Sequence, residues 1–291
     1  MKPVVIGLGE ILWDVFPEGK KLGGAPLNFS HHCAQLGGEA YPVSAVGADA
    51  EGAEIRQILA SKNLSDLHVQ TDPAHPTGRV NVTLKDGKPT YEILRDVAWD
   101  HIQFTPALAD LAARADAACF GSLAQRNSVS LESIHTFLDA MRPEALKIFD
   151  INLRQDFYNR EIIESSLRRA NIFKLSDEEL PVLAAMFDLT GDARTQLHRV
   201  RELFDLRLVA YTRGGSGSLL LTANETSDHL GLPTQVIDTV GAGDSFTATL
   251  CMGLLKNLPL AETNIRANRV AAFVCSQAGA TPTLPDAIIE S

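Results

Sequence analysis

Short apolar runs alternate along the chain with longer segments in which apolar residues recur every three or four positions. The runs are rich in Val, Ile, Phe and Ala, which is typical of strands, and they are Val4–Leu8, Val43–Val46, Ala117–Phe120, Ile148–Ile151, Ile172–Leu175 and Leu208–Tyr211. The segments with helical spacing are Leu27–Leu36, Ala53–Leu59, Leu131–Met141, Glu161–Ala170, Glu178–Phe187 and Gln196–Phe204. This alternation predicts an α/β fold in which a parallel-rich sheet carries helices on both faces.

The stretch Gly78–Leu94 departs from this alternation and has the pattern of a hairpin. Polar and apolar residues alternate in the order Arg79, Val80, Asn81, Val82, Thr83 and Leu84, and Lys85-Asp86-Gly87-Lys88 is a turn motif. An isolated hairpin is only marginally stable, so it must pack against further strands. Ile11–Val15 and Lys20–Leu22 are the candidates. We therefore expect a small antiparallel β-lid, formed by approximately residues 11–22 and 78–95, over the ends of the parallel strands.

The last third of the chain predicts two long helices, Ser245 to about Lys256 and Leu260 to about Gln277. The chain has 291 residues, which suits either two domains of ~150 residues or one large α/β domain with an insertion. We expect a single domain over residues 1–291 that includes the lid.

The composition narrows the class of protein. Hydrophobic residues make up 45%, charged residues 21%, and the formal net charge is −10. Such an acidic chain repels phosphate backbones, which disfavours nucleic-acid binding, and no apolar run reaches the ~18 residues of a membrane span. Four scattered cysteines without a C-x-x-C pair (Cys33, Cys119, Cys251 and Cys275) predict buried free thiols. With no signal-peptide pattern at the N-terminus, we expect a cytoplasmic protein.

The strongest chemical motif is Gly241-Ala242-Gly243-Asp244 at the start of a predicted helix. Small residues there leave backbone N–H groups uncovered, and these groups and the helix dipole favour an anion. A carboxylate in a first turn can simply cap the helix. Beside a phosphate cradle, Asp244 can instead take a proton from a hydroxyl nucleophile. Local physics leaves both interpretations open, although an acid beside an anion site favours the catalytic one.

Three further motifs each allow a structural and a functional interpretation. Gly23–Asn28 precedes a helix and is either a tight turn or a site where backbone and Asn28 bind a polyol. Asp14 is either a solvated turn carboxylate or an acceptor for two sugar hydroxyls. Thr212–Gly217 is either a hairpin turn or the small-residue end of a strand that binds a nucleotide.

Other motifs are excluded. Gly7-Leu8-Gly9 is not a dinucleotide fingerprint, because Leu12 stands where the third glycine is needed, and no P-loop motif occurs. His31 and His32 are adjacent and face different sides of a helix, so they do not predict a zinc site.

Taken together, the blocks resemble the ribokinase-like (PfkB-type) sugar kinase family, and within it the fructokinase-like branch. Seven blocks occur in the family's order: Gly9-Glu10-Ile11-Leu12-Trp13-Asp14, Gly23–Asn28, Val46–Gly52, Asp150–Arg154, Lys174–Glu179, Thr212–Ser218 and Asp238–Phe246. The last block is highly specific, Gly-Gly-Ala-Pro-x-Asn is moderately specific, and the others are weak singly.

The resemblance implies a Rossmann-like, ribokinase-like three-layer core with a β-lid, and phosphoryl transfer from ATP to a sugar hydroxyl. Carried over by position, Asp244 is the catalytic base, and the backbone of Gly241, Ala242 and Gly243 forms the anion hole. The positions implied for sugar hydroxyls are Asp14, Gly24 and Asn28, and those implied for the nucleotide are Thr212, Gly214, Gly217 and Asn268. Asp238 is implied to help hold a monovalent cation, often potassium. Magnesium would bridge the phosphate oxygens.

One departure concerns the metal. The family usually has Asn-x-x-Glu where this chain reads Ser176-Asp177-Glu178-Glu179. Glu179 is expected to act on magnesium through water, and the shorter Ser176 would join that network only through an added water. Two arginines, Arg79 on the hairpin and Arg154 after a strand, are further candidates for substrate binding. Each has a surface position as its alternative.

Several alternatives stay open on sequence grounds. Fructose is the first expected substrate; ribose, 2-keto-3-deoxygluconate, tagatose 6-phosphate or a nucleoside would keep the chemistry and change the sugar. A non-catalytic sugar-binding protein on the same fold is a different class of function, but the intact Asp244 and glycine cradle disfavour it. A lid with an exposed sheet edge, together with the resemblance, favours a homodimer.

Overall fold

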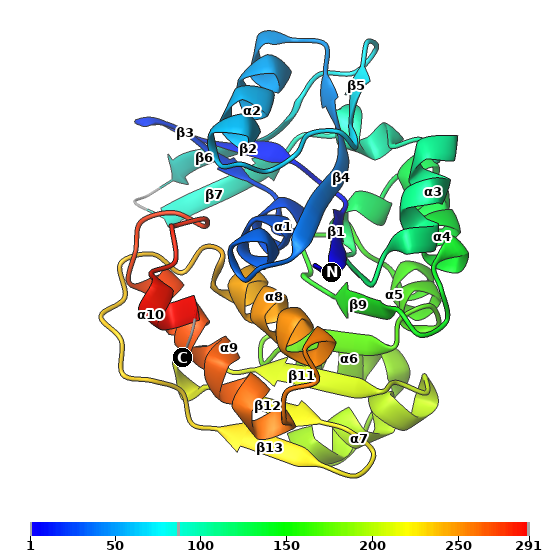
Figure 1. Cartoon of the computed structure of the whole chain (residues 1–291), viewed down its shortest axis with the longest axis vertical. Coiled ribbons are helices and arrows are strands. Elements are labelled where there is room, and N and C mark those ends of the chain that lie inside the picture. Colours follow the sequence, from blue (N-terminus) through cyan, green and yellow to red (C-terminus); the bar gives the residue numbers. More distant parts are fainter. Residues whose placement is uncertain (1, 86–87, 290–291) are drawn as a thin grey trace.

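A nine-stranded sheet runs through the computed structural model, which describes residues 2–85 and 88–289 (Figure 1). Its strands in spatial order are β13 (Thr226–His229), β12 (Ser218–Leu221), β11 (Leu208–Thr212), β10 (Ile172–Ser176), β9 (Leu146–Asp150), β8 (Ala117–Phe120), β1 (Val4–Leu8), β4 (Glu39–Gly47) and β5 (Val69–Asp72). The strands from β11 to β5 in this order are all parallel, whereas β12 pairs in antiparallel fashion with both β11 and β13. The predicted parallel-rich sheet is confirmed.

Helices cover both faces of the sheet, which confirms the three-layer core. One face carries α3 (Pro106–Arg114), α4 (Ser128–Ala140), α5 (Arg160–Leu167), α6 (Leu180–Phe187) and α7 (Ala193–Leu203). The other carries α1 (Ala25–Gln35), α2 (Ala50–Ser61), α8 (Ala242–Leu255) and α9 (Leu260–Cys275). Short elements complete the described chain: η1 (Ala98–His101), η2 (Leu123–Gln125), η3 (Gly214–Ser216) and α10 (Asp286–Ile289).

Alternate residues of the parallel strands form the two halves of the core. Phe120, Phe149 and Phe173 lie on neighbouring strands and stack on one face, with ring centroids 5.2 and 5.7 Å apart. Ile148 and Ile172 point to the opposite face and pack under α8 and α9. Because both faces are buried, these strands appear in the sequence as continuous apolar runs.

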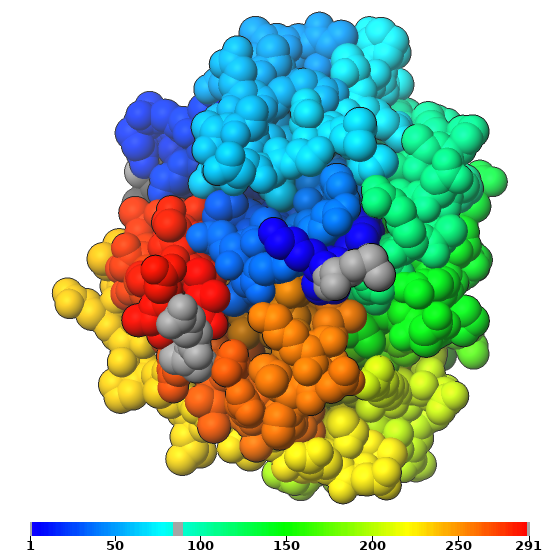
Figure 2. Space-filling model, viewed as in Figure 1, coloured from blue at the N-terminus to red at the C-terminus, as the bar shows by residue number. Residues whose placement is uncertain are grey.

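Segments from the first and last parts of the chain lie together on one side of the molecule. Figure 2 shows the blue N-terminal segments beside the orange and red C-terminal helices on the same face, and α1 packs directly against α8. This packing brings the Gly23–Asn28 and Asp238–Phe246 blocks together.

A four-stranded lid sheet lies apart from the main sheet, in the order β3 (Gly19–Gly23), β2 (Leu12–Phe16), β6 (Gly78–Lys85) and β7 (Lys88–Ile93). The expected hairpin is confirmed as β6 and β7, while its turn residues Asp86 and Gly87 lie outside the described residues. The lid is not antiparallel throughout, because β2 pairs with β6 in parallel from Leu12 opposite Gly78. Strand β2 follows β1 along the chain, and β6 follows β5. Because β2 and β6 enter the lid from the same side, they pair in parallel.

Two expectations from composition can be compared with the structure. The four cysteines are free, and three of them, Cys33, Cys119 and Cys251, are buried. Across residues 2–85 and 88–289, no helix has the length and apolar character needed to cross a bilayer.

Candidate active site

A cavity of about 980 Å³ lies between the lid and the carboxyl ends of the central strands. The lid contributes an apolar wall that includes Phe16, Val80 and Ile93, and the core contributes charged side chains. The charged lining residues are Glu10, Asp14, Lys21, Arg154, Lys174, Asp238 and Asp244. An enclosed space with one apolar and one polar wall is typical of a small-molecule site.

The glycines before α8 determine the shape of the cavity floor. Gly241 is the N-cap of α8 with φ +81°, and a Cβ there would lie 2.5 Å from the carbonyl oxygen of Ala280, so no other residue fits without displacement. Gly241 and Gly243 line the cavity. The N–H of Ala242 instead donates to the Thr239 carbonyl at 3.3 Å. Of the three expected cradle residues, Ala242 therefore already has a partner for its N–H.

Asp244 lies in the first turn of α8 and is half-buried, with its side chain at the cavity. Asn28 on α1 donates from Nδ2 to Asp244 Oδ2 at 2.8 Å. Burial raises the pKa of Asp244 from 3.8 to about 6, partly opposed by the Asn28 hydrogen bond. A carboxylate with a pKa near neutrality is a stronger base than a solvated aspartate and is still ionised at pH 7.

A buried charged pair lies beneath the cradle, and the sequence analysis assigned it no role. Lys174 Nζ bonds to Asp150 Oδ1 at 3.0 Å, and Thr247 Oγ1 donates to Asp150 Oδ2 at 3.0 Å. Burial disfavours the charged lysine, but Asp150 and Glu179 still hold the pKa of Lys174 above its usual value. A lysine inside the apolar run of β10 was the available signal, since such a residue is rarely buried unless it is paired.

The residues expected to bind sugar come together on one side of the cavity. Asp14, Gly24, Asn28 and Arg154 all line it. Gly24 has φ +116°, and a Cβ there would lie 2.3 Å from the Glu10 carbonyl oxygen, so glycine allows the tight entry into α1. Burial raises the pKa of Asp14, while Arg154 and Lys21 oppose that rise.

Arg79 is not part of this cavity, which corrects the expectation for it. Its neighbour Val80 lines the cavity, so Arg79 points to the opposite face of the lid sheet, as strand alternation requires. There Arg79 Nε donates to Glu51 Oε2 on α2 at 2.5 Å. Arg79 therefore ties the lid to α2.

Glu10 lines the cavity and was not singled out as a site residue. The residue is 3% exposed, and its Oε2 has no hydrogen-bond partner among the described residues. Burial raises the pKa of Glu10 from 4.5 to about 7. Its signal in the sequence was a lone glutamate directly after the buried strand β1.

The residues expected to bind the nucleotide lie beyond the lining of this cavity. Thr212 ends β11, and Gly214 and Gly217 form the turn into β12, so this segment is a hairpin, one of the two interpretations of the sequence. Gly217 has φ +85°, and a Cβ there would lie 1.9 Å from the His229 carbonyl oxygen. Asn268 on α9 is buried, and its Nδ2 donates to Ser218 Oγ at 2.7 Å.

The two expected metal residues have structural partners. Glu179 Oε1 accepts from the Leu153 N–H at 2.9 Å, and Oε2 accepts from the N–H and hydroxyl of Ser176 at 2.7 and 2.9 Å. Ser176 therefore bonds directly to Glu179. Asp238 lines the cavity, and its Oδ2 accepts from the Gly279 N–H at 3.1 Å.

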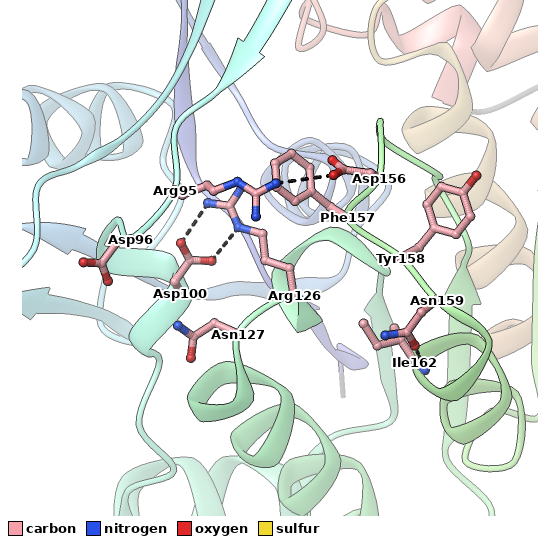
Figure 3. Close-up of a pocket in the computed structure, with 10 residues that line it drawn as sticks. All are labelled: Arg95, Asp96, Asp100, Arg126, Asn127, Asp156, Phe157, Tyr158, Asn159 and Ile162. Carbon is pink, nitrogen blue, oxygen red and sulfur yellow. Dashed lines mark hydrogen bonds and ion pairs between the residues drawn. The ribbon is translucent and has the colours of Figure 1, made fainter.

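A second cavity, of about 330 Å³, opens beside the loop after β7 (Figure 3). Four of its charged groups are paired with each other: Arg126 binds both oxygens of Asp100 at 2.8 Å, and Arg95 bonds to Asp156 at 3.5 Å. The Arg126 guanidinium also lies 4.0 Å from the ring centroid of Trp99. This arrangement holds the lid hairpin to the core, because Arg126 also donates to the Leu94 carbonyl.

Comparison with known proteins agrees with this geometry. Residues 14–287 match the family model described as pfkB family carbohydrate kinase. The fructokinase of Salmonella typhimurium is 29% identical over 94% of this chain and 92% of its own length. The sugar kinase PH1459 of Pyrococcus horikoshii superposes with a TM-score of 0.84 at 27% identity, over 100% of this chain and 97% of that one. A fructokinase of Vibrio cholerae with fructose, ADP and calcium bound superposes with a TM-score of 0.82 at 26% identity, over 100% and 98%.

The family match covers nearly the whole chain, including the lid from β2 onward and the α8 cradle. A carboxylate at a helix N-terminus, facing a cavity with further polar side chains, is an arrangement suited to transferring a phosphoryl group to an alcohol. The chain therefore belongs to the pfkB family of carbohydrate kinases and is an ATP-dependent sugar kinase.

Proposed function

We propose that this kinase transfers the γ-phosphoryl group of ATP to a hydroxyl of fructose. The observation that carries the proposal is the Asp244 carboxylate, held by Asn28 in a cavity that Asp14 and Gly24 also line. Relatives along almost the whole chain are named fructokinases, which supports fructose among the sugars.

Asp244 acts as the base in this mechanism. Asn28 occupies Oδ2, so Oδ1 accepts the proton of the sugar hydroxyl. The hydroxyl oxygen forms the new bond to the γ-phosphorus, the bond from that phosphorus to the bridging oxygen breaks, and ADP leaves with the electron pair. General-base assistance of this kind contributes ~10²–10⁴-fold.

The start of α8 supplies the charge stabilisation. First-turn N–H groups have no partner within a helix, so those of Gly243 and Asp244 are the donors for the transferring phosphoryl oxygens, together with the backbone of Gly241. The N–H of Ala242 joins them only if it turns from the Thr239 carbonyl. Charge that develops on the phosphoryl oxygens is stabilised by these groups.

The nucleotide and its cations use residues around this centre. We place the nucleotide along Thr212, Gly214 and Gly217, with Asn268 beneath it. Magnesium, which neutralises phosphate charge when bound, fits Glu179 through water, since both carboxylate oxygens already accept hydrogen bonds. A monovalent cation such as potassium fits the carboxylate of Asp238, which joins two loops.

The charges of the cavity favour a neutral sugar. Four carboxylates line it, Glu10, Asp14, Asp238 and Asp244, against the cations Lys21, Arg154 and Lys174. Lys174 is already paired with Asp150, and Arg79 is outside the cavity. Acidic or phosphorylated sugars, such as 2-keto-3-deoxygluconate and tagatose 6-phosphate, would meet net negative charge there. Ribose and nucleosides stay as the neutral alternatives.

The test is ADP release with ATP and magnesium, with and without potassium, across fructose, ribose, glucose, tagatose, 2-keto-3-deoxygluconate, fructose 6-phosphate and adenosine. We expect fructose to give the highest kcat/KM. Asp244→Asn should lower kcat by ~10²–10⁴-fold while calorimetry still detects sugar binding. Asp188→Asn, the same change at an exposed helix end with φ +54°, is the matched control and should keep full activity. A higher kcat/KM for another sugar would overturn the assignment of fructose as substrate and leave the mechanism standing. Full activity of Asp244→Asn would overturn the mechanism itself.

We also propose that the protein is a homodimer joined through the lids. β3 and β7 are the edge strands of the lid sheet, and Tyr91 on β7 is 55% exposed. Exposed sheet edges with apolar side chains readily pair with a second copy. Light scattering in dilute solution should give twice the chain mass, and a single-chain mass would contradict the proposal.

A further inference from the structure

Two histidines and an aspartate gather outside the active-site cavity. Asp96 Oδ1 lies 2.8 Å from His101 Nε2 and 3.6 Å from His75 Nε2. The two imidazole rings stack with centroids 3.6 Å apart and 8° between their planes. One ligand atom from each residue lies within 4.8 Å of the others, so three potential donor atoms lie close together.

A further carboxylate orients this cluster. His75 Nδ1 lies 2.8 Å from Asp72 Oδ2, and Asp72 Oδ1 also accepts from the N–H groups of Ala74 and His75 at 2.7 and 3.1 Å. A proton on His75 Nδ1 leaves the lone pair of Nε2 directed at Asp96. A carboxylate behind an imidazole is the usual support of a metal-binding histidine, because it fixes the tautomer and the ring orientation.

The cluster lies at the hinge of the lid hairpin. His75 comes shortly before β6, which begins at Gly78, and Asp96 follows β7, which ends at Ile93. His101 belongs to η1 in the core. Figure 3 shows the Asp96 side chain directed away from the Arg126–Asp100 ion pair, so its carboxylate is not used by that pair.

We propose that His75, Asp96 and His101 form a binding site for a zinc-class divalent cation, which ties both ends of the lid hairpin to the core. Two imidazole nitrogens and one carboxylate oxygen suit Zn²⁺, Co²⁺ or Ni²⁺, whereas Mg²⁺ and Ca²⁺ prefer all-oxygen sites. The site is therefore distinct in chemistry from any magnesium held with ATP.

The distances fit such an ion. Bonds of about 2.0–2.1 Å in a tetrahedral zinc site place ligand atoms roughly 3.3 Å apart, and the two distances to Asp96 Oδ1, 2.8 and 3.6 Å, lie on either side of that value. The Asp96 side chain is 73% exposed, which leaves an entry path and room for water as the fourth ligand. On binding, the stacked imidazole rings must turn so that both Nε2 lone pairs face the ion, and the proton of His101 moves from Nε2 to Nδ1.

A bound cation is expected to restrict the movement of the lid hairpin. Without the cation, the hairpin ends already bond to the core near this point, through Thr77 to Asp49 and through the Leu94 carbonyl to Arg126. A cation bound by His75, Asp96 and His101 would fix both ends relative to η1. Hairpin opening would then become rarer, because the metal–ligand bonds must break first.

The test is titration of tag-free, metal-stripped protein with Co²⁺, followed by visible absorption, and with Zn²⁺ by calorimetry. We expect one ion per chain, with the intense bands of tetrahedral Co²⁺. His75→Ala, Asp96→Asn and His101→Ala should each weaken affinity at least ~10-fold, and Asp72→Asn by roughly 10–100-fold. His198→Ala on α7 removes a histidine elsewhere and should bind as the wild type does. Circular dichroism of each variant checks that it folds.

Hydrogen exchange is the second measurement, and it needs no kinase activity. Zn²⁺ should slow exchange of the β6 and β7 amides in the wild type and leave it unchanged in His101→Ala. The proposed metal site would be overturned if the wild-type protein did not bind Zn²⁺ at ~100 µM. It would also be overturned if the wild type and all three ligand variants bound Zn²⁺ equally well. Binding without any change in hairpin exchange would overturn the hinge role. None of these outcomes depends on which sugar is phosphorylated.

Discussion

Asn28 Nδ2 donates a hydrogen bond of 2.8 Å to Asp244 Oδ2, joining two residues that lie 216 positions apart. The bond orients the carboxylate and opposes the rise in its pKa that burial causes. The capping interpretation of Asp244 is wrong, because Gly241 is the N-cap of α8 and no side chain caps the helix there, whereas Asp244 lines the cavity.

Asn28→Ala tests how the Asn28 hydrogen bond affects the orientation and the pKa of the Asp244 carboxylate. Loss of a hydrogen bond to a charged group costs ~1.5–3 kcal/mol, so kcat/KM should fall about 10- to 100-fold. The pKa of Asp244 should rise, which moves the acidic limb of the pH–rate profile to higher pH. A profile that keeps the wild-type acidic limb would mean that the bond does not act on the base.

The wild-type pH–rate profile is a prediction of its own. Asp244 has a pKa of about 6 and must be ionised to accept a proton. Activity should therefore rise as pH increases through 6 and be half-maximal there. Steady-state rates at saturating sugar and ATP, between pH 5 and 8, measure this limb. An acidic limb near pH 4 would indicate that Asp244 is solvated in the working enzyme.

Glu10→Gln should stabilise the protein at neutral and alkaline pH. The pKa of Glu10 is about 7 in the folded chain and 4.5 as a free group, so the folded state binds the extra proton. Stability therefore falls as pH rises from 4.5 to 7, by about 3 kcal/mol at ~1.36 kcal/mol per pKa unit. Urea unfolding at pH 5 and 8 should show that slope reduced in Glu10→Gln and unchanged in the exposed control Glu178→Gln.

Gly241→Ala tests the requirement for glycine at the cradle. The new methyl group would lie 2.5 Å from the Ala280 carbonyl oxygen, at a backbone φ of +81°. We expect a loss of at least ~2 kcal/mol in stability and a fall in kcat. Gly37→Ala has a similar φ of +96° with nothing within 4 Å of the added group, so it should cost less and leave kcat unchanged. Equal losses in both variants would argue against the contact with Ala280.

Arginine replacements should separate the two faces of the lid. Arg154 lines the cavity, whereas Arg79 pairs with Glu51 on the outer face. Arg154→Ala should raise the KM for sugar about 10-fold, the effect of ~1.4 kcal/mol of lost binding, and Arg79→Ala should change it less than about 2-fold. A large KM effect in Arg79→Ala alone would reverse the assignment.

The sequence predicted the sheet and the hairpin well, because both follow from local periodicity. The apolar runs became β1, β8, β9, β10 and β11, and the alternation from Gly78 became β6. Glycine motifs also identified the start of α8, since Gly241 tolerates the φ that its position requires.

Periodicity could not assign the lid's faces or the long-range pairs. Alternation shows that Arg79 and Val80 lie on opposite faces, but which face meets the cavity depends on how the lid sits on the core. The contact of Lys174 with Asp150 needs the register of β9 and β10, where these two residues lie side by side. The departure at Ser176 was visible, but its direct bond to Glu179 depended on the turn geometry after β10.

The packing of α1 against α8 has a consequence for how the enzyme is made. The sugar side of the site comes from the first strands and α1, while the base and its cradle come from near the end of the chain. The ribosome synthesises a chain from its N-terminus, and a domain generally folds as a unit, so the lid strands and most of the main sheet are made before Asp244 is added. Phosphoryl transfer then becomes possible only when the chain is almost finished, and a prematurely terminated product would hold sugar-binding residues without the base that consumes ATP.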